Sequence, residues 1–366
     1  MTRVQRLARS IPPLCHLGVV AADTREKSAE NAKANAFLPQ RHKEHRLTFR
    51  IRQVKGYTEG MTLQYHHLRR YASVFLSMTG LRVGEFDRLA TEVLPQFEAD
   101  ENQRLARPTR QRAVGGGEKP HLDSRDQLLL TVIWLRQYPI HDVLGFFFGV
   151  SQPTVGRYIE RVLPLLEQSG RDSMKGHDPG RKRRRSLAAL LEDVPDLARV
   201  VDSFEQRVQR PKIVADRDGW YSGKKRMHTV KSQIVVESES GWIRDIADSV
   251  KGRVSDIKLI EQSGVLDDLP DLTGMMGDAA YQGILKLHPL GCSPYKKPIR
   301  GELTEDMIAY NHAFSQRRII VETIINRLRR YQSLTQMDRQ HRLGHTARVC
   351  AVAGLVNRQL RHRMAA

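Results

Sequence analysis

The pattern of apolar residues changes near residue 195, and this change limits the folds that the chain can adopt. Before it, apolar residues such as Leu128, Val132 and Leu135 recur with the period of a helix. After Pro195 the chain shows short alternating or continuously apolar runs, which are typical of strands. Long helical patterns return from Thr304 onward. We therefore predict an α+β or α/β protein, in which an all-helical N-terminal domain precedes a mixed sheet flanked by helices.

The expected elements follow from these periods and from turn residues. In the N-terminal half we expect one helix at 67–77 and a second that begins at Val83 and is closed by Pro95. In the C-terminal half we expect a short helix at 255–262, long helices from Thr304 with the last at 346–361, and strands at 197–204, 227–238, 242–250, 274–277 and 293–298.

Positive charge is concentrated in three segments of the 366-residue chain. Lys and Arg number 60 against 41 Asp and Glu, a net charge of +19. Residues 1–60, 171–185 and 317–366 carry +7, +5 and +9, so the rest of the chain is slightly negative. Clustered basic charge is typical of a protein that follows a phosphate backbone, and it predicts nucleic acid as a partner.

Charge and composition also divide the chain. We predict a disordered basic extension at 1–60, a helical DNA-binding domain at 61–170, a basic linker at 171–195 and a second domain at 196–366. No apolar stretch approaches the roughly 20 residues of a membrane helix, so no membrane partner is expected. The three cysteines form no CxxC pair, which argues against a disulfide scaffold and a cysteine zinc site.

The segment IHDVLGFFFGVSQPTVGRYI, residues 140–159, has the pattern of a helix-turn-helix that we extend to about 140–163. Gly149 suits the left-handed end of the first helix, and Ser151 suits the cap of the second. Spacing alone also fits an ordinary helical hairpin. In the helix-turn-helix reading, the outward residues that read a major groove are Gln152, Thr154, Arg157, Tyr158 and Arg161.

Three acids stand out by position. Asp202 comes near the end of the first predicted strand, Asp278 ends the fourth, and Glu322 lies on the polar face of a helix between Arg318 and Arg329. Carboxylates that converge in this way form the all-oxygen site that Mg²⁺ prefers. Taken singly, each has a plainer interpretation: the aspartates as turn residues, and Glu322 as a surface partner of Arg318.

Two further segments stand out, WYSGKKRMHTVK at residues 220–231 and GDAAYQG at residues 277–283. The first resembles a basic segment, and the second the second-aspartate motif, of the DDE transposases of the insertion-sequence-five group, which are related to the Harbinger nucleases. The spacing of Ser315, Arg318, Glu322 and Arg329 matches the motif around the family's glutamate, with Ser315 and Arg329 in place of Tyr and Lys.

The resemblance implies an RNase H-like catalytic domain in which Asp202, Asp278 and Glu322 form the catalytic triad and bind two Mg²⁺ or Mn²⁺ ions. It also implies cleavage at element ends and strand transfer into target DNA, a homo-oligomer on double-stranded DNA, and a bacterial cytoplasmic, nucleoid-associated location. The residues expected to hold DNA phosphates near this site are Lys224, Lys225, Arg226, His228, Lys231, Arg318 and Arg329.

Other interpretations stay open at this stage. A helix-turn-helix regulator without catalytic activity would explain the charge, although it would leave the three acids unexplained. A nuclease that hydrolyses DNA without joining strands would share the fold. An inactive relic of a transposase would keep the same residues. The basic turn at 224–226 and His228 also have purely structural interpretations.

Overall fold

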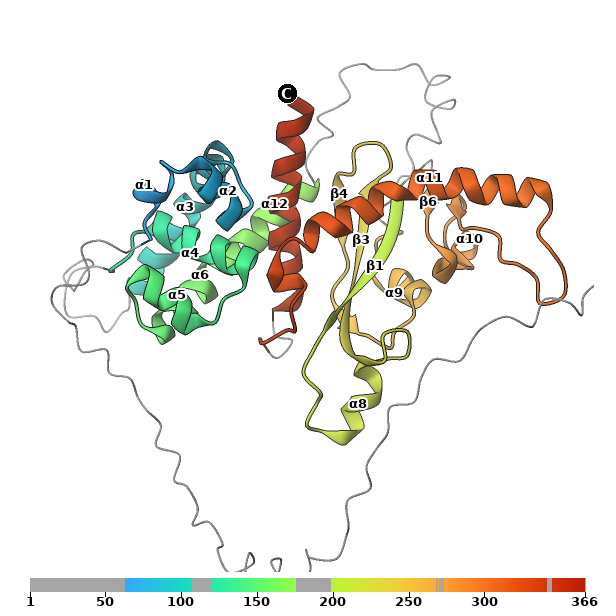
Figure 1. Ribbon diagram of the computed structural model, residues 1–366, viewed down its shortest axis with the longest axis horizontal. Coiled ribbons are helices and arrows are strands. Elements are labelled where there is room, and N and C mark those ends of the chain that lie inside the picture. Colours follow the sequence, from blue (N-terminus) through green and yellow to red (C-terminus); the bar gives the residue numbers. More distant parts are fainter. Residues whose placement is uncertain are drawn as a thin grey trace, which may run out of the picture. The chain divides into compact units, whose positions relative to one another are not determined.

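The computed structural model describes residues 63–106, 120–175, 199–267, 269, 273–340 and 344–365, which all belong to one compact unit. The predicted N-terminal extension at 1–60 and most of the predicted linker lie outside these residues. The architecture is a helical region followed by a mixed sheet flanked by helices, so the predicted fold class is confirmed (Figure 1). No helix in the described ranges is long and apolar enough to cross a membrane.

The helical region differs from the prediction at two points. The expected helix at 67–77 is two helices, and the expected stop at Pro95 lies inside a longer one. An internal proline removes one helical hydrogen bond, but apolar residues on both sides of it, including Val93 and Phe97, are buried in the same core. The helices of the helical region are α1 (Tyr65–Leu68), α2 (Ala72–Thr79), α3 (Val83–Leu105), α4 (Ser124–Gln137), α5 (His141–Phe148) and α6 (Gln152–Lys175).

The sheet has the order β2-β3-β1-β6-β7, with β4 and β5 also paired to β3. β1 pairs antiparallel with β3 over its whole length and parallel with β6. The predicted third strand is divided into two, and the predicted strand at 293–298 is wrong because pairing occurs just before it. The strands are β1 (Arg199–Arg207), β2 (Tyr221–Ser222), β3 (Met227–Glu237), β4 (Ile243–Ile246), β5 (Val250–Lys251), β6 (Met275–Met276) and β7 (Gly291–Cys292).

Helices cover both faces of this sheet. One face of β1 and β3, with Val200 and Ile234, packs in the large core beneath α11 and α12. The opposite face, with Val201 and Val235, packs against α9 and the turn η3. The predicted helices at 255–262 and from Thr304 are confirmed. The helices and helical turns that follow β1 are α8 (Val214–Trp220), α9 (Asp256–Gln262), η3 (Ala279–Tyr281), α10 (Ile284–Leu287), α11 (Glu305–Leu328), η4 (Gln332–Leu334) and α12 (His345–Ala365).

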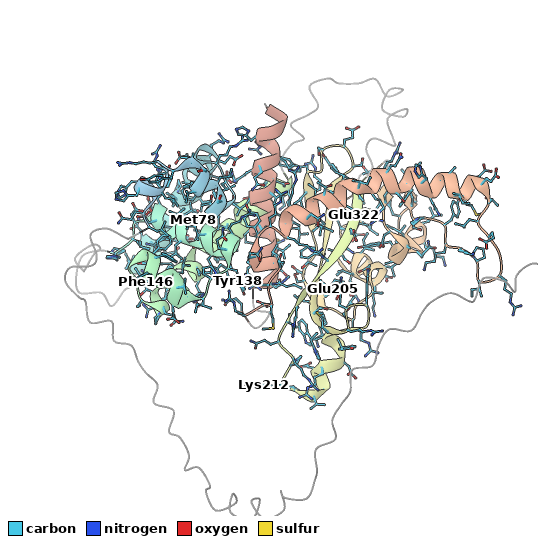
Figure 2. All side chains as sticks on the ribbon, viewed as in Figure 1. Met78, Tyr138, Phe146, Glu205, Lys212 and Glu322 are labelled. Atoms are coloured by element: carbon cyan, nitrogen blue, oxygen red, sulfur yellow. The ribbon has the colours of Figure 1, made fainter. Side chains whose placement is uncertain are left out.

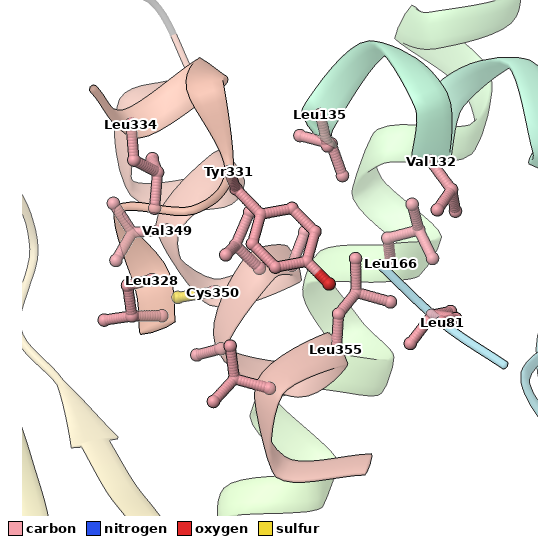
Figure 3. Close-up of a cluster of buried hydrophobic side chains, with 14 of the residues drawn as sticks. Leu81, Val132, Leu135, Leu166, Leu328, Tyr331, Leu334, Val349, Cys350 and Leu355 are labelled. Atoms are coloured by element: carbon pink, nitrogen blue, oxygen red, sulfur yellow. The ribbon is translucent and has the colours of Figure 1, made fainter. Parts of the chain in front are cut away.

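The helical region and the sheet region share one hydrophobic core because α6 packs directly on α12. Figure 3 shows this core, where Tyr331, just after α11, lies among side chains of α4, α6 and α12. Residues 171–175, which we assigned to a linker, instead continue α6, and the Trp242 side chain donates to the Ser173 carbonyl at 3.2 Å. The second helix of the helix-turn-helix is therefore also part of the packing around the sheet.

Two glycines allow α6 and α12 to approach this closely. A Cβ atom on Gly170 would lie 2.1 Å from the carbonyl oxygen of Cys350, and one on Gly354 would lie 2.6 Å from the Cα atom of Gly170. Both neighbours are backbone atoms, which cannot move aside as a flexible side chain can. The crossing therefore excludes every side chain at these two positions.

We expect Gly170→Ala to lower the free energy of unfolding by about 2–4 kcal/mol, because the new methyl group overpacks a backbone-to-backbone contact. Gly84→Ala is the matched control, since Gly84 is also helical and a Cβ atom there would lie 4.0 Å from its nearest neighbour, a flexible Arg88 nitrogen. The control should be unchanged or up to about 1 kcal/mol more stable. Urea unfolding measures both, and equal effects would contradict the importance of the crossing.

Candidate active site and DNA-binding surface

Asp202 and Asp278 come together because β1 and β6 pair in parallel. Arg199 of β1 pairs with Met275 of β6, an offset of 76 residues, and the same interval separates the two aspartates. Adjacent strands lie about 4.8 Å apart, so this register brings the two positions side by side. Asp202 lies within β1 and not near its end, which corrects the prediction. Asp202 still lies at the edge of the paired region, because the neighbouring strand β6 is short and ends just before Asp278.

The Asp202 carboxylate is largely buried, with 18% of its side chain exposed. One oxygen accepts the Ser203 backbone N–H at 2.7 Å, and the other is 3.3 Å from a guanidinium nitrogen of Arg318. Burial nevertheless raises the pKa of Asp202 to about 6, and the charges of Asp278 and Asp256 add to this rise against the Ser203 and Arg318 contacts. The site therefore favours an added positive charge.

The turn after β6 fixes Asp278. One carboxylate oxygen accepts the Ala280 N–H at 2.8 Å and so caps η3. The Tyr281 ring packs against Gly277, where a Cβ atom would lie 2.5 Å from the Cβ of Tyr281. The Tyr281 hydroxyl accepts from the Gln233 side-chain amide at 2.9 Å. A glycine before the aspartate and a buried tyrosine after it thus hold the carboxylate at the site.

Helix α11 brings a cation and the third predicted acid to β1. Arg318 reaches Asp202, and its Nε is buried without a hydrogen-bond partner among the described residues. Glu322 lies one helical turn further along α11 (Figure 2), and its side chain is exposed. Asp202, Asp278 and Glu322 do not form a ready metal site, because no three Asp, Glu, His or Cys side chains in the described ranges lie close enough to hold a metal ion. The structure thus joins two of the predicted triad and leaves the third nearby.

A buried ion pair supports the opposite face of β1. Lys231 of β3 donates to the Asp256 carboxylate at 2.8 Å and to the Val254 carbonyl at 2.6 Å. The same Asp256 oxygen accepts the Ser203 hydroxyl at 2.6 Å. Lys231 is only 5% exposed, so the prediction that it holds a DNA phosphate is wrong. Its role is to neutralise Asp256, which in turn orients the residue next to Asp202.

Asp256 and Ser203 are the site residues that the sequence analysis did not assign. The sequence carries no separate signal for them, because the burial that gives Lys231 a need for a partner is seen only in the structure. Lys231 lies in a run of β3 that is buried from Thr229 to Val236, and a lysine inside a strand covered on both faces needs a buried partner.

The other predicted phosphate-binding residues lie in two places. The turn of Lys224, Lys225 and Arg226 is exposed between β2 and β3, as a phosphate contact requires. His228 beside it is half-buried, and burial together with Arg210 and Arg217 lowers its pKa. Arg329 is exposed at the end of α11.

The helix-turn-helix forms as predicted, with α5 ending at Gly149 in the left-handed conformation (φ 68°) and α6 beginning after Ser151. Gly145 lets the turn close, because a Cβ there would lie 2.5 Å from the Val150 carbonyl oxygen. At the start of α6 the residues with exposed or half-exposed side chains include Gln152, Thr154 and Arg157.

Two of the predicted base-reading residues differ from this pattern. Tyr158 is 5% exposed, so its prediction as an outward residue is wrong. It lies three residues after Val155 and therefore on the same buried stripe of α6. Arg161 is half-buried, and its Nε lies 3.5 Å from the Glu101 carboxylate on α3. The part of α6 that is open to a groove is thus its first turn and Arg157.

Comparison with protein families identifies both parts of the chain. Residues 201–357 match the model of the DDE superfamily endonucleases, and residues 120–172 match the helix-turn-helix of DDE superfamily endonucleases. The first match includes Asp202, Asp278 and Glu322, and the second includes α4, α5 and most of α6.

A curated relative extends this likeness across most of the chain. The chain is 30% identical over 244 residues to the probable transposase for insertion sequence element IS702 of Microchaete diplosiphon, a match that covers 67% of this chain and 83% of the relative. No solved structure matches the chain significantly. Similarity of this extent, together with the two family matches, shows that the chain belongs to the DDE-superfamily transposases that carry an N-terminal helix-turn-helix.

Proposed function

We propose that this transposase cleaves DNA at the ends of its element and transfers the resulting strand into target DNA, with Asp202, Asp278 and Glu322 as its catalytic acids. The observation that carries the proposal is the parallel register of β1 and β6, which brings two carboxylates of the family's pattern into one partly buried site. Glu322 is on the adjoining helix, one turn from an arginine that already reaches Asp202.

The site suits Mg²⁺ or Mn²⁺. Two neighbouring carboxylates, of which Asp202 has its pKa raised first by burial and further by the charge of Asp278, offer the hard oxygen ligands and the excess negative charge that such an ion requires. We propose that Asp202 and Asp278 hold the ions, two per site, and that Glu322 joins them when DNA is bound. Ions of this kind activate the attacking oxygen and stabilise the leaving oxygen of a phosphodiester.

The protein's own residues then bind and orient DNA. Arg318 has an unsatisfied buried N–H beside Asp202, which is suited to a phosphate oxygen near the bond that is cut. Arg329 and the turn at 224–226 contact the backbone further away. The first turn of α6 reads the element ends, and we expect a homo-oligomer that acts at the bacterial nucleoid, in the cytoplasm, on both ends.

Substitution of any of the three acids tests the catalytic assignment. We expect Asp202→Asn, Asp278→Asn and Glu322→Gln to reduce metal-dependent cleavage of a duplex with the element's end by at least about 10³-fold, because each removes a charged oxygen ligand. DNA binding should survive. Glu305→Gln, on the exposed first turn of the same helix, is the matched control and should cleave normally.

Retained cleavage in one acid variant would remove that residue from the proposal. A wild-type chain that binds the duplex but cleaves it in neither Mg²⁺ nor Mn²⁺ would favour a regulator or an inactive relic. Cleavage without joining of a pre-cut 3′ end would favour a simple nuclease.

The raised pKa of Asp202 predicts that the site lowers stability at neutral pH. The folded protein holds this proton up to a pH of about 6, whereas the unfolded chain loses it near 3.8. The free energy of unfolding should therefore fall as the pH rises from about 4 to 6, by up to about 3 kcal/mol for this one group. Above pH 6 the Asp202 carboxyl is charged in both states, so the free energy of unfolding is lowered by this full amount.

We expect Asp202→Asn to be more stable than the wild type at pH 7 and similar to it near pH 4. Mg²⁺ should raise the melting temperature of the wild type and have little effect on the variant. Thermal unfolding across this pH range, with and without the metal, measures both effects. A variant less stable than the wild type at pH 7 would contradict the role of buried charge.

The groove-reading role of α6 has its own test. We expect Gln152→Ala and Arg157→Ala to weaken binding to element-end DNA by about 5- to 100-fold, the range for loss of a base or phosphate contact. Gln168→Ala is the matched control, because Gln168 is also exposed on α6 but lies about four turns away from the first turn. Equal effects of Gln152→Ala and Gln168→Ala in fluorescence anisotropy would argue against this surface.

A further inference from the structure

A second cluster of cations surrounds a cavity of about 330 Å³ near the end of α11. Its wall includes Arg82 before α3, Arg136 on α4, and Arg327 and Arg330 at the end of α11. We call this cavity the arginine pocket. It lies apart from Asp202 and Asp278, neither of which lines it.

Positive charge in the arginine pocket exceeds negative charge. Glu85 is the one acidic residue among the described residues that line it. Its carboxylate accepts the Arg82 backbone N–H at 2.7 Å and so closes the first turn of α3. Guanidinium groups remain charged at all physiological pH values, and their mutual repulsion is relieved when an anion binds between them.

The wall of the pocket is built from fixed groups. The Arg136 guanidinium stacks over the Tyr331 ring at 5.1 Å, and this tyrosine is 1% exposed. The Gln359 side chain donates both to the Tyr331 hydroxyl at 3.1 Å and to the Gly80 carbonyl at 2.6 Å. A Cβ atom on Gly80 (φ 77°) would lie 2.8 Å from the Tyr331 hydroxyl, so the wall needs glycine there. At least one arginine is thus held in position before any ligand arrives.

The origin of the arginines indicates which anion they bind. Two come from the helical region, Arg327 comes from the helix that carries Arg318 and Glu322, and Arg330 comes just after that helix. Arg327 follows Glu322 by five residues, which is about 8 Å along the helix axis and about 140° around it. Successive phosphates of one strand rise about 3.4 Å along the duplex axis, so a duplex at the active site has other phosphates within this span.

We infer that the arginine pocket binds a phosphodiester of the DNA that also enters the active site. The inference rests on the proposed function, which supplies DNA as the ligand. One phosphate held by both regions would link the helix-turn-helix part of the chain to the end of α11 on a single duplex. Inorganic phosphate has the same chemistry, so the test separates the two sources.

The salt dependence of DNA binding tests the inference on the full chain. The slope of log K against log salt falls by about 0.9 for each phosphate contact that is lost. We expect Arg136→Gln, Arg330→Gln and the double variant each to reduce the slope by about one, because both arginines hold the same phosphate. A reduction by about two in the double variant would overturn the shared phosphate, because it would show two separate contacts. Arg88→Gln, exposed on α3 and outside the pocket, is the control.

Each outcome of the test is decisive. A slope equal to that of Arg88→Gln overturns the inference. Stabilisation by inorganic phosphate that the variants lose, with an unchanged DNA slope, also overturns it and assigns the pocket to free phosphate. If Arg136→Gln does not fold, the exposed Arg330 decides alone. If cleavage requires the three acids but the salt slope is unchanged, only this inference is rejected. If the slope is reduced but no cleavage occurs, only the proposed function is rejected.

Discussion

The contact between α6 and α12 at Gly170 and Gly354 determines how the two parts of this transposase are joined. The helix that carries Gln152 and Arg157, for which we propose contacts with DNA, runs through 24 residues, about 36 Å, into the core around the sheet. A flexible tether would leave the DNA-reading helix free to rotate, whereas a helix packed by its own backbone does not rotate alone. The orientation of the helix-turn-helix relative to α12 therefore follows from helix packing.

The chemistry of the site depends on a second arrangement, the division of charge between the two faces of β1. Asp202 points to the α11 face and meets Arg318, whereas Ser203 points to the α9 face and meets Asp256. Lys231 neutralises Asp256 from within the sheet. Asp202 keeps a pKa of about 6 because burial outweighs its contacts with Ser203 and Arg318. This unfavourable charge is what a ligand cation would relieve, so binding capacity is obtained at some expense of stability.

Much of this arrangement could be predicted from the sequence, because it follows from the period of the apolar residues and from the spacing of the acidic residues. The helix-turn-helix followed from Gly149 and the apolar positions, and the interval of 76 residues between Asp202 and Asp278 is the register offset of two paired strands. Spacing does not reveal which side chains tertiary contacts cover. Tyr158 is an exception, because its spacing of three residues from Val155 places it on the buried stripe of α6 and could have corrected its assignment. Strand lengths were harder to predict for a related reason. β6 and β7 are each two residues long, and they are held by pairing with neighbours and not by their own composition.

Lys231 was misassigned because β3 is buried on both faces, so the alternation that normally separates inside from outside is absent. Glu322 was found by resemblance, and its distance from the aspartates depends on a side-chain position that no sequence pattern specifies.

The basic C-terminal segment shows why net charge overstates the surface available to DNA. Residues 317–366 carry +9, yet Arg348 is 1% exposed and lies 2.8 Å from the buried Asp338 carboxylate. Arg358 is half-buried and reaches Glu92 of α3 at 2.6 Å and the Ser169 hydroxyl of α6 at 2.8 Å. These cations hold α12 to its neighbours. The cations that we propose for phosphate include Arg318, Arg329 and the arginine pocket. Because α11 carries Arg318 and leads to Arg329 and the pocket, we propose that DNA binding and catalysis meet along this helix.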